Sequence, residues 1–326
     1  MKIRTLARPI YIRYTGGPEQ GLVLAKVAQT EDKRKKNRRF LSRGATSGRA
    51  WPHYNDGMTM MKTKQEITRN WLQRYTNTPL DKFGRYILLT NFNNYVDLFC
   101  EQTGIPVPDY SANMRMATAG DFTIINFGMG SPNAALVTDL LSAVRPEACL
   151  FLGKCGGVGS SLQLGDFLLP VAAVRGEGTS NDYFPAEVPA LPHFILQRVV
   201  SSALKEFQLP YWAGVVYTTN RRVWEHDDKF KDYLRQIRVM GVEMECATLF
   251  SCGSFNHMVM GALLLVSDNP MMPEGVKTTE SDHKVTAEFA ATHVKVGIEA
   301  LRMVADGAAM QDCMKFEPYQ PWEQDN

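Results

Sequence analysis

The sequence predicts a single α/β domain, in which helices cover both sides of a central sheet. Two observations lead to this fold class. Apolar runs of strand length alternate with segments whose apolar residues recur at helical spacing, and several of these runs end in glycine-rich or polar loops. The longest apolar run, at about residues 259–266, is far shorter than the roughly 18 apolar residues of a membrane span. Because the cysteines, described below, also indicate a reducing compartment, we expect a cytoplasmic protein.

Charge is unevenly distributed along the 326 residues. Residues 1–60 carry 13 Lys and Arg against 4 Asp and Glu, which leaves 23 against 30 for residues 61–326. The basic run at 33–39 and the scarcity of apolar periodicity predict a disordered extension. A transit peptide or a nucleic-acid-binding arm would fit this composition, but our interpretation is that translation starts near Met61. The acidic remainder argues against nucleic acid as a partner.

The six cysteines are predicted to be reduced and buried. They form no CxxC pair, and no histidine lies near them at the spacing of metal ligands. An alternative for one of them is a catalytic thiol at Cys155, which precedes two glycines. The cysteines are Cys100, Cys149, Cys155, Cys246, Cys252 and Cys313.

A helix, a strand and a second helix open the expected domain. Apolar residues at 64–75 recur at helical spacing, and the Asn77-Thr-Pro segment ends that helix. The apolar run 86–90 predicts a buried strand, and the asparagine-rich loop 91–94 leads into a helix that ends near Thr103.

A glycine-rich turn follows the next strand, which is expected at residues 122–127. Gly128 and Gly130 lie where this strand passes into a helix that reaches about Val144. Free backbone N–H groups and the helix dipole make such a turn a candidate site for an anion or a sugar. Glycine is also needed in many such turns for geometry alone, so this alternative stays open.

A third strand, at residues 148–153, is followed by Lys154 and, two residues later, Gly156. Because the carboxyl ends of parallel strands meet at one edge of a sheet, three such loops in succession predict the rim of one pocket. Lys154 is a candidate partner for a phosphate group on the substrate; alternatively, it is a solvated loop residue.

The second half of the domain follows the same rules. Long apolar runs predict strands, and segments with apolar residues three and four positions apart predict helices. The remaining elements are a strand at 166–174, a helix at 192–207, a strand at 215–219, a polar helix at 227–238, a strand at 260–266 and a helix at 282–304.

Two arginines and a tryptophan follow the strand at 215–219. Arg221 and Arg222 could bind a phosphate monoester bidentately, and Trp224 offers a face for a purine ring. The alternative is a solvated charge cluster beside a core tryptophan.

Three carboxylates complete the set of candidate residues. Glu243 and Glu245 flank Met244 where an apolar segment turns into a predicted helix, and a carboxylate there can accept both hydroxyls of a ribose. Asp268 ends a strand beside the expected pocket, where desolvation would raise its pKa and let it deliver a proton. The alternatives are the first turn of a surface helix and a simple Asp-Asn-Pro turn.

Several of these motifs resemble, in the same order, those of one enzyme superfamily. Gly241-Val-Glu-Met-Glu-Cys-Ala247 is similar to the signature of the purine nucleoside phosphorylases, uridine phosphorylases and nucleosidases, and Glu177-Gly-Thr-Ser180 resembles another of their loops. Within this superfamily, residues 61–316 resemble the AMP nucleosidases in a short form, and residues 317–326 would be a tail. The resemblance implies a mixed central sheet, no metal or organic cofactor, and a homo-oligomer that is often a hexamer.

The resemblance also implies a reaction, the hydrolysis of AMP to adenine and ribose 5-phosphate. Asp268 would act as the acid at purine N7, and Glu245 would accept the 2′ and 3′ hydroxyls. Met244 would pack against the sugar, and Glu243 would position water. The other expected substrate-binding residues are Lys154, Gly156, Arg221, Arg222, Trp224, Thr179, Ser180, Gly128 and Gly130.

Two departures from the superfamily bear on the reaction. Phe151 occupies the position where phosphorylases carry an arginine for orthophosphate, so water becomes the better nucleophile. The loop 91–94 lacks the carboxylate that nucleosidases acting on methylthioadenosine place there, which leaves the residue that orients water open. The alternatives are a phosphorylase and a nucleotide-binding sensor without catalysis.

Overall fold

A computed structural model describes residues 62–307, which all belong to one compact unit. The predicted N-terminal extension at 1–60 and the predicted tail at 317–326 lie outside the described residues.

The centre of this unit is an eight-stranded mixed sheet. Its strands, in chain order, are β1 (Tyr86–Thr90), β2 (Arg115–Ala119), β3 (Phe122–Asn126), β4 (Ala148–Gly157), β5 (Phe167–Gly176), β6 (Tyr211–Thr219), β7 (Gly241–Glu243) and β8 (Met260–Asp268). The spatial order is β2-β3-β1-β4-β7-β6-β5-β8, with parallel and antiparallel neighbours. β8 pairs with β4 as well as with β5, so β4, β7, β6, β5 and β8 close into a ring.

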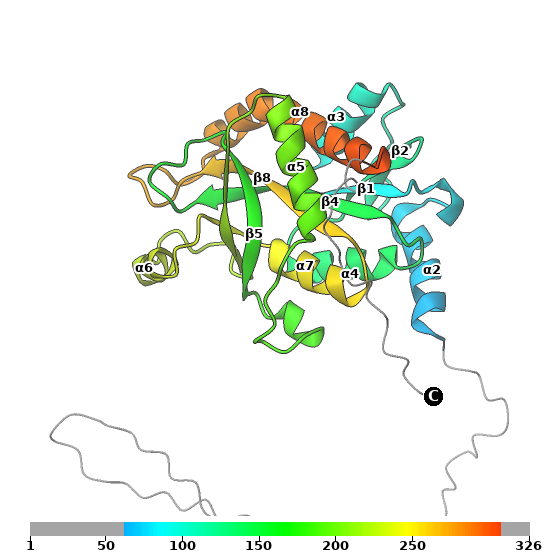
Figure 1. Cartoon of the computed structure of the whole chain (residues 1–326), viewed down its shortest axis with the longest axis horizontal. Helices are drawn as coiled ribbons and strands as arrows, with labels where there is room; N and C mark the ends of the chain where they lie inside the picture. Colours follow the sequence, from blue (N-terminus) through cyan, green and yellow to red (C-terminus); the bar gives the residue numbers. More distant parts are fainter. Residues whose placement is uncertain (1–61, 308–326) are drawn as a thin grey trace, which may run out of the picture. The chain divides into compact units, whose positions relative to one another are not determined.

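Helices cover both sides of the sheet, as the sequence predicts (Figure 1). The helices are α2 (Lys64–Thr76), α3 (Asn93–Thr103), α4 (Ser131–Leu141), α5 (Phe194–Glu206), α6 (Asp228–Gln236), α7 (Cys246–Phe255) and α8 (Thr279–Ala305), with short 3-10 helices η1 (Leu80–Lys82) and η2 (Thr179–Asp182). One apolar cluster packs α2, α4 and α7 against the sheet, and a second packs α3, α5 and α8 against its other side.

Residues of β4 show how one strand serves both clusters. Cys149 and Phe151 lie in the cluster with α4 and α7, whereas Leu150 and Leu152 lie in the cluster with α3 and α8. Side chains alternate between the two faces of a strand, so an uninterrupted apolar run fills both sides. This explains why these strands are uniformly apolar in sequence.

The structure corrects the predicted boundaries at β4. The strand continues to Gly157, so Lys154 and Gly156 belong to it and are not in a loop. Lys154 fits into the strand because its ammonium group hydrogen-bonds to α8 and lies over the ring of Phe92, at 4.9 Å from the ring centroid. A charged side chain with such partners does not end a buried strand.

One strand, β2, was not predicted from the sequence. It contains arginine and two alanines, which are unfavourable for a strand. Arg115 is nevertheless buried, because its guanidinium donates to the Asp97 carboxylate at 2.6 Å and to the backbone carbonyl oxygens of Asn93 and Pro108. These bonds allow an edge strand to carry a buried charge.

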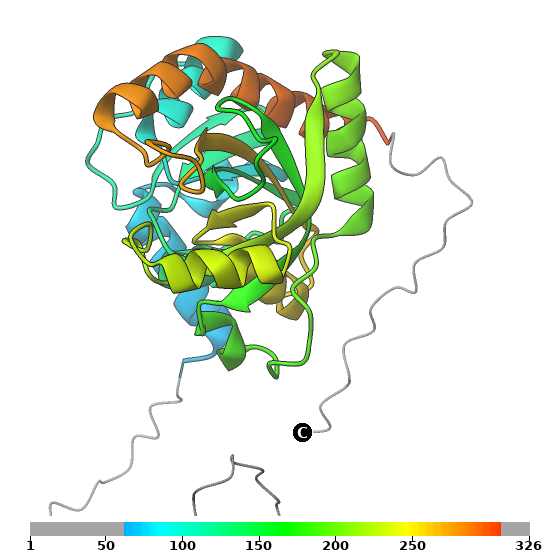
Figure 2. The same cartoon turned by 90° about the vertical axis from the view of Figure 1, so that its left-hand side faces the viewer.

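The start of α8 is fixed by a capping box. The hydroxyl of Thr278 accepts from the backbone N–H of Ser281, and the Ser281 side chain accepts from the N–H of Thr278. This fixes the backbone next to Lys277 and Asp282, which lie beside the candidate site. The chain between β8 and α8 (orange) and α6 both lie at the left of the domain in Figure 1, the side that faces the viewer in Figure 2.

The five cysteines within residues 62–307 are buried and free of disulfides, as predicted; Cys313 lies outside this range. In the same part of the chain, no helix combines the length and apolar character that crossing a membrane requires.

Candidate active site

The candidate site is a pocket where β1, β4, β6 and β8 end and the short strand β7 passes into α7. It contains about 600 Å³ of empty space, including the part open to solvent. Its wall consists of Asn91, Phe92, Met129, Lys154, Cys155, Gly156, Thr219, Arg222, Trp224, Glu225, Val242, Glu243, Met244, Glu245, Ser267, Asp268 and Lys277.

Glu245 precedes the first residue of α7 and is buried in this wall. Its Oε1 accepts a hydrogen bond of 2.7 Å from the backbone N–H of Gly130. Burial, followed by the nearby carboxyl group of Glu243, raises the pKa of Glu245 to about 8. Burial thus favours the protonated form of this side chain, and hydroxyl donors from a ligand would favour the ionised form.

Gly130 has a φ of +93° and Gly128 a φ of +84°, values that L side chains rarely adopt. The turn thus requires glycine for its geometry, the alternative that the sequence left open. It also presents one N–H to Glu245, so the turn contributes to the site through that carboxylate. Neither glycine lies on the pocket wall.

Glu243 uses both carboxylate oxygens within the protein. Oε1 accepts from the hydroxyl of Thr218, and Oε2 accepts from the backbone N–H groups of Glu245 and Cys246, both at 2.6 Å. Burial raises the pKa of Glu243, and these three donors oppose that effect. The side chain caps the first turn of α7 and so holds Glu245 in place, which leaves it little capacity to position water.

Asp268 is the last residue of β8 and is buried at the pocket wall. Burial raises the pKa of its carboxyl group, while Lys277 and a 2.8 Å hydrogen bond from the Ser267 hydroxyl act in the opposite direction. A carboxylic acid that keeps its proton because of burial, at the edge of a pocket, can act as a general acid.

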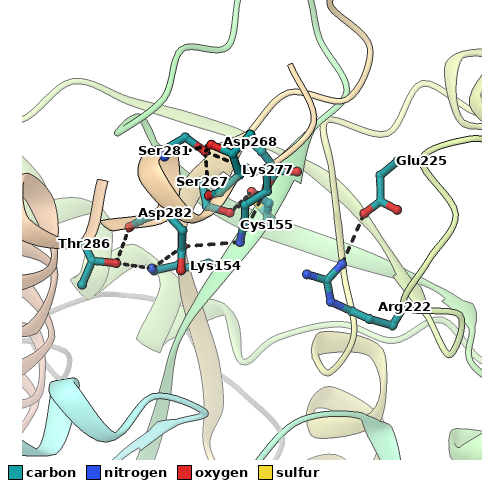
Figure 3. A network of polar contacts seen from close by, with 11 residues as sticks. Lys154, Cys155, Arg222, Glu225, Ser267, Asp268, Lys277, Ser281, Asp282 and Thr286 are labelled. Carbon is teal, nitrogen blue, oxygen red and sulfur yellow. Dashed lines mark hydrogen bonds and ion pairs between the residues drawn. The ribbon is translucent and has the colours of Figure 1, made fainter. Parts of the chain in front are cut away.

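Basic side chains line the same wall (Figure 3). Lys154 donates to Asp282 at 2.9 Å and to the hydroxyl of Thr286 at 2.6 Å, both on α8. Arg222 is half exposed and pairs with Glu225 at 3.2 Å. Both cations therefore have partners within the protein, which an anionic ligand would have to share or displace.

The structure brings eight of the thirteen predicted site residues onto one wall and leaves five outside it. The residues on the wall are Asp268, Glu245, Glu243, Met244, Lys154, Gly156, Arg222 and Trp224. Besides Gly128 and Gly130, the residues outside it are Arg221, Thr179 and Ser180. Arg221 instead pairs with Asp227 at 2.9 Å and lies over the ring of Phe230.

Ser180 and Thr179 belong to η2 and lie apart from the pocket wall. The hydroxyl of Ser180 is fully buried and accepts from the guanidinium of Arg175 at 2.8 Å, while its backbone N–H donates to Glu177. These contacts organise the loop after β5 and account for its polar sequence.

Sequence reasoning missed several wall residues, of which Asn91, Thr219, Glu225, Ser267 and Lys277 are polar. Asn91 was noted only as part of an asparagine-rich loop, although a polar residue directly after a buried strand is a usable signal. Cys155 also lies on the wall, but burial raises its pKa well above the usual range, so the thiolate needed for nucleophilic catalysis is disfavoured. Within residues 62–307, no group of three or more His, Cys, Asp or Glu side chains is placed to hold a metal ion.

Comparisons with known proteins agree with this architecture. The sequence model of the phosphorylase superfamily matches residues 85–302. AMP nucleosidase from Escherichia coli (strain K12) is 26% identical over 279 residues, which are 72% of this chain and 57% of that protein. Guanosine phosphorylase from Halorubrum lacusprofundi is 27% identical over 165 residues, or 51% of this chain and 68% of that protein. The chain thus spans little more than half the length of the first of these relatives.

Two solved structures extend the comparison. AMP nucleosidase from Bacteroides thetaiotaomicron is 50% identical, with a TM-score of 0.68 over 76% of this chain and 100% of that chain. Uridine phosphorylase from Vibrio fischeri is 21% identical, with a TM-score of 0.61 over 68% of this chain and 93% of that chain. The similarity to uridine phosphorylase concerns the fold alone.

Proposed function

The chain belongs to the phosphorylase superfamily, and we propose that it hydrolyses the N-glycosidic bond of AMP to give adenine and ribose 5-phosphate. The observation that carries this proposal is that two buried carboxyl groups, those of Asp268 and Glu245, line one pocket and both have pKa values raised by burial. The relatives named AMP nucleosidase support a purine nucleotide as substrate.

Asp268 acts on the leaving base. The N9–C1′ bond breaks and its electron pair moves to N9, while Asp268 transfers its proton to N7, so that adenine leaves as a neutral molecule. The oxygen of a water molecule bonds to C1′ and its surplus proton passes to solvent, from which Asp268 takes a new proton. The buried site favours the protonated acid before the reaction and so supplies the proton that the base requires.

Glu245 acts on the sugar. Its carboxylate accepts the 2′ and 3′ hydroxyls and stabilises the positive charge that develops on the ribose as the bond breaks. The Gly130 N–H and the capping of α7 by Glu243 keep this carboxylate in one orientation. Glu243 is thus a positioning residue in our proposal.

Lys154 and Arg222 bind the 5′-phosphate in this proposal, because both are cations on the pocket wall. Arg221 has no part in it, since its guanidinium is directed to Asp227 and Phe230. The energy of this remote contact helps to place C1′ between the acid and the water.

Water is the nucleophile in our proposal, and Phe151 is the reason. The side chain is fully buried in the core and lies against Phe127, with 5.7 Å between ring centroids. No guanidinium for orthophosphate can therefore come from this position. The competing function is that of a phosphorylase, because another relative carries that name.

Phosphorus NMR of AMP incubated with the protein and excess orthophosphate tests the choice of nucleophile. We expect one new resonance, that of ribose 5-phosphate, and an unchanged orthophosphate signal, at a rate that does not rise with orthophosphate. The appearance of ribose 1,5-bisphosphate at the expense of orthophosphate would mean that the protein is a phosphorylase.

A further inference from the structure

Lys277 lies between two carboxylates beside the pocket. Its Nζ is 3.8 Å from Oδ1 of Asp268 and 3.6 Å from Oδ1 of Asp282, and its side chain is one quarter exposed. Both distances exceed that of a hydrogen bond, so Lys277 is attracted by both groups and held firmly by neither. Figure 3 shows Lys277 between Asp268 and the start of α8.

The other two cations of the pocket wall are more tightly paired. Lys154 is almost fully buried and hydrogen-bonds to Asp282, and Arg222 pairs with Glu225. Among the three cations, Lys277 therefore has the longest distances to its carboxylate partners.

The place of Lys277 beside the acid fits a contact with the substrate's phosphate. In a purine nucleotide with the usual anti orientation of the base, the N7–C8 edge lies on the same side of the sugar as the 5′ carbon. An acid placed at N7 is then close to the 5′-phosphate, and Lys277 is already beside that acid.

We propose that Lys277 couples recognition of the 5′-phosphate to the protonation of Asp268. This inference rests on the proposed function. In the structure Lys277 is shared by Asp268 and Asp282. When AMP binds, the phosphate draws Lys277 towards itself, and Asp268 loses the positive charge that favours its ionised form. Asp268 then holds its proton most firmly when a phosphorylated substrate is in place.

The direction of the effect follows from the charges that face Asp268. Lys277, Arg222 and Lys154 are the cations near it, and Glu225 and the Cys155 thiol are the other titratable groups. Lys277 favours the carboxylate, so its departure raises the pKa of Asp268, and the incoming phosphate dianion adds to this rise. Adenosine has no phosphate and leaves Lys277 in place, so a smaller fraction of Asp268 carries the proton that N7 requires.

Calorimetry of ribose 5-phosphate binding at pH 7.5 tests this coupling without turnover. Titrations in buffers of different ionisation enthalpy measure the protons taken up on binding. The ribose hydroxyls favour the ionised form of Glu245, so binding also releases protons there in every variant, and the measure is the difference between variants. The wild type is expected to take up a fraction of a proton more than Asp268→Asn, in which that carboxyl group is absent. Lys277→Met is expected to show less than half of this difference, and Lys277→Arg most of it.

Steady-state kinetics provide a second test of the coupling. Lys277→Met should lower kcat/KM for AMP by about tenfold to a hundredfold, because a contact to the phosphate is lost, yet raise kcat for adenosine at neutral pH, because a larger fraction of Asp268 is then protonated. Lys284→Met, which removes an exposed lysine of α8, is the matched control and should alter neither.

Two sets of results would overturn the coupling alone. These are equal proton uptake by wild type and Lys277→Met, or an equal loss of activity with AMP and adenosine in that variant. If the wild type itself cleaves no AMP, the proposed function fails and the coupling fails with it, so the two failures are distinguishable.

Discussion

Replacing Asp268 by Asn is expected to lower kcat for AMP by about 10²–10⁴-fold, the usual contribution of a general acid, while KM changes by only a few-fold. The amide keeps the size of the side chain and can still accept the hydrogen bond from Ser267, but it has no acidic proton for N7. Steady-state kinetics, with adenine followed by chromatography, measure the effect. The change in kcat must be compared with the change in KM, because loss of an interaction made only in the transition state lowers kcat without weakening ground-state binding.

Asp232→Asn is the matched control for this variant. Asp232 lies on α6, pairs with Arg235 and is three-quarters exposed, so the same chemical change there should leave kcat intact. Near-normal turnover by Asp268→Asn, with AMP still cleaved, would remove Asp268 from the role of acid. A loss that came with an unfolded protein would be recognised by circular dichroism.

Replacing Glu245 by Gln is expected to lower kcat/KM for AMP by about 10²–10³-fold, the usual effect of removing one electrostatic partner of the transition state. The amide can still accept from Gly130, but it lacks the charge that stabilises the cationic ribose. Glu206→Gln, on the exposed face of α5, is the control and should have no effect. If Glu245→Gln retained wild-type kcat/KM, the ribose clamp would have to lie elsewhere.

The same variant has a second signature, in stability. The pKa of Glu245 is raised from 4.5 to about 8 in the folded protein, so folding is favoured while this carboxyl group keeps its proton. That contribution is complete below about pH 4.5 and is lost as the pH rises through about 8. Relative to the wild type, Glu245→Gln should therefore gain about 2–4 kcal/mol in free energy of unfolding between pH 5 and pH 8. Urea unfolding at both pH values measures it, and a difference independent of pH would contradict the raised pKa.

The sequence was most informative where a buried strand meets its first polar residue. The apolar run that becomes β8 ends directly in Ser267 and Asp268, so both the strand and the polar residues at its end could be predicted. The same holds for β1 and the asparagine-rich loop after it. Strand length was less predictable. Lys154 continues β4 because α8 supplies its hydrogen-bond partners, and these partners lie far from Lys154 in the sequence.

Side-chain direction was the main feature that the sequence did not contain. Arg221 and Arg222 are adjacent and were predicted to act together, yet only Arg222 lies on the pocket wall, because the two side chains leave an irregular segment in different directions. Lys277 was not predicted at all. It lies in a polar stretch without periodicity and reaches Asp268 because the chain turns back into α8, a tertiary effect that no local pattern encodes.

The most direct test of the account is chromatography of AMP incubated with the wild type and with Asp268→Asn in buffer without orthophosphate. We predict that the wild type converts AMP to adenine and ribose 5-phosphate in equal amounts and that the variant does so at least about a hundredfold more slowly. Recovery of intact AMP from the wild type would contradict the account and would favour a protein that binds the nucleotide without cleaving it.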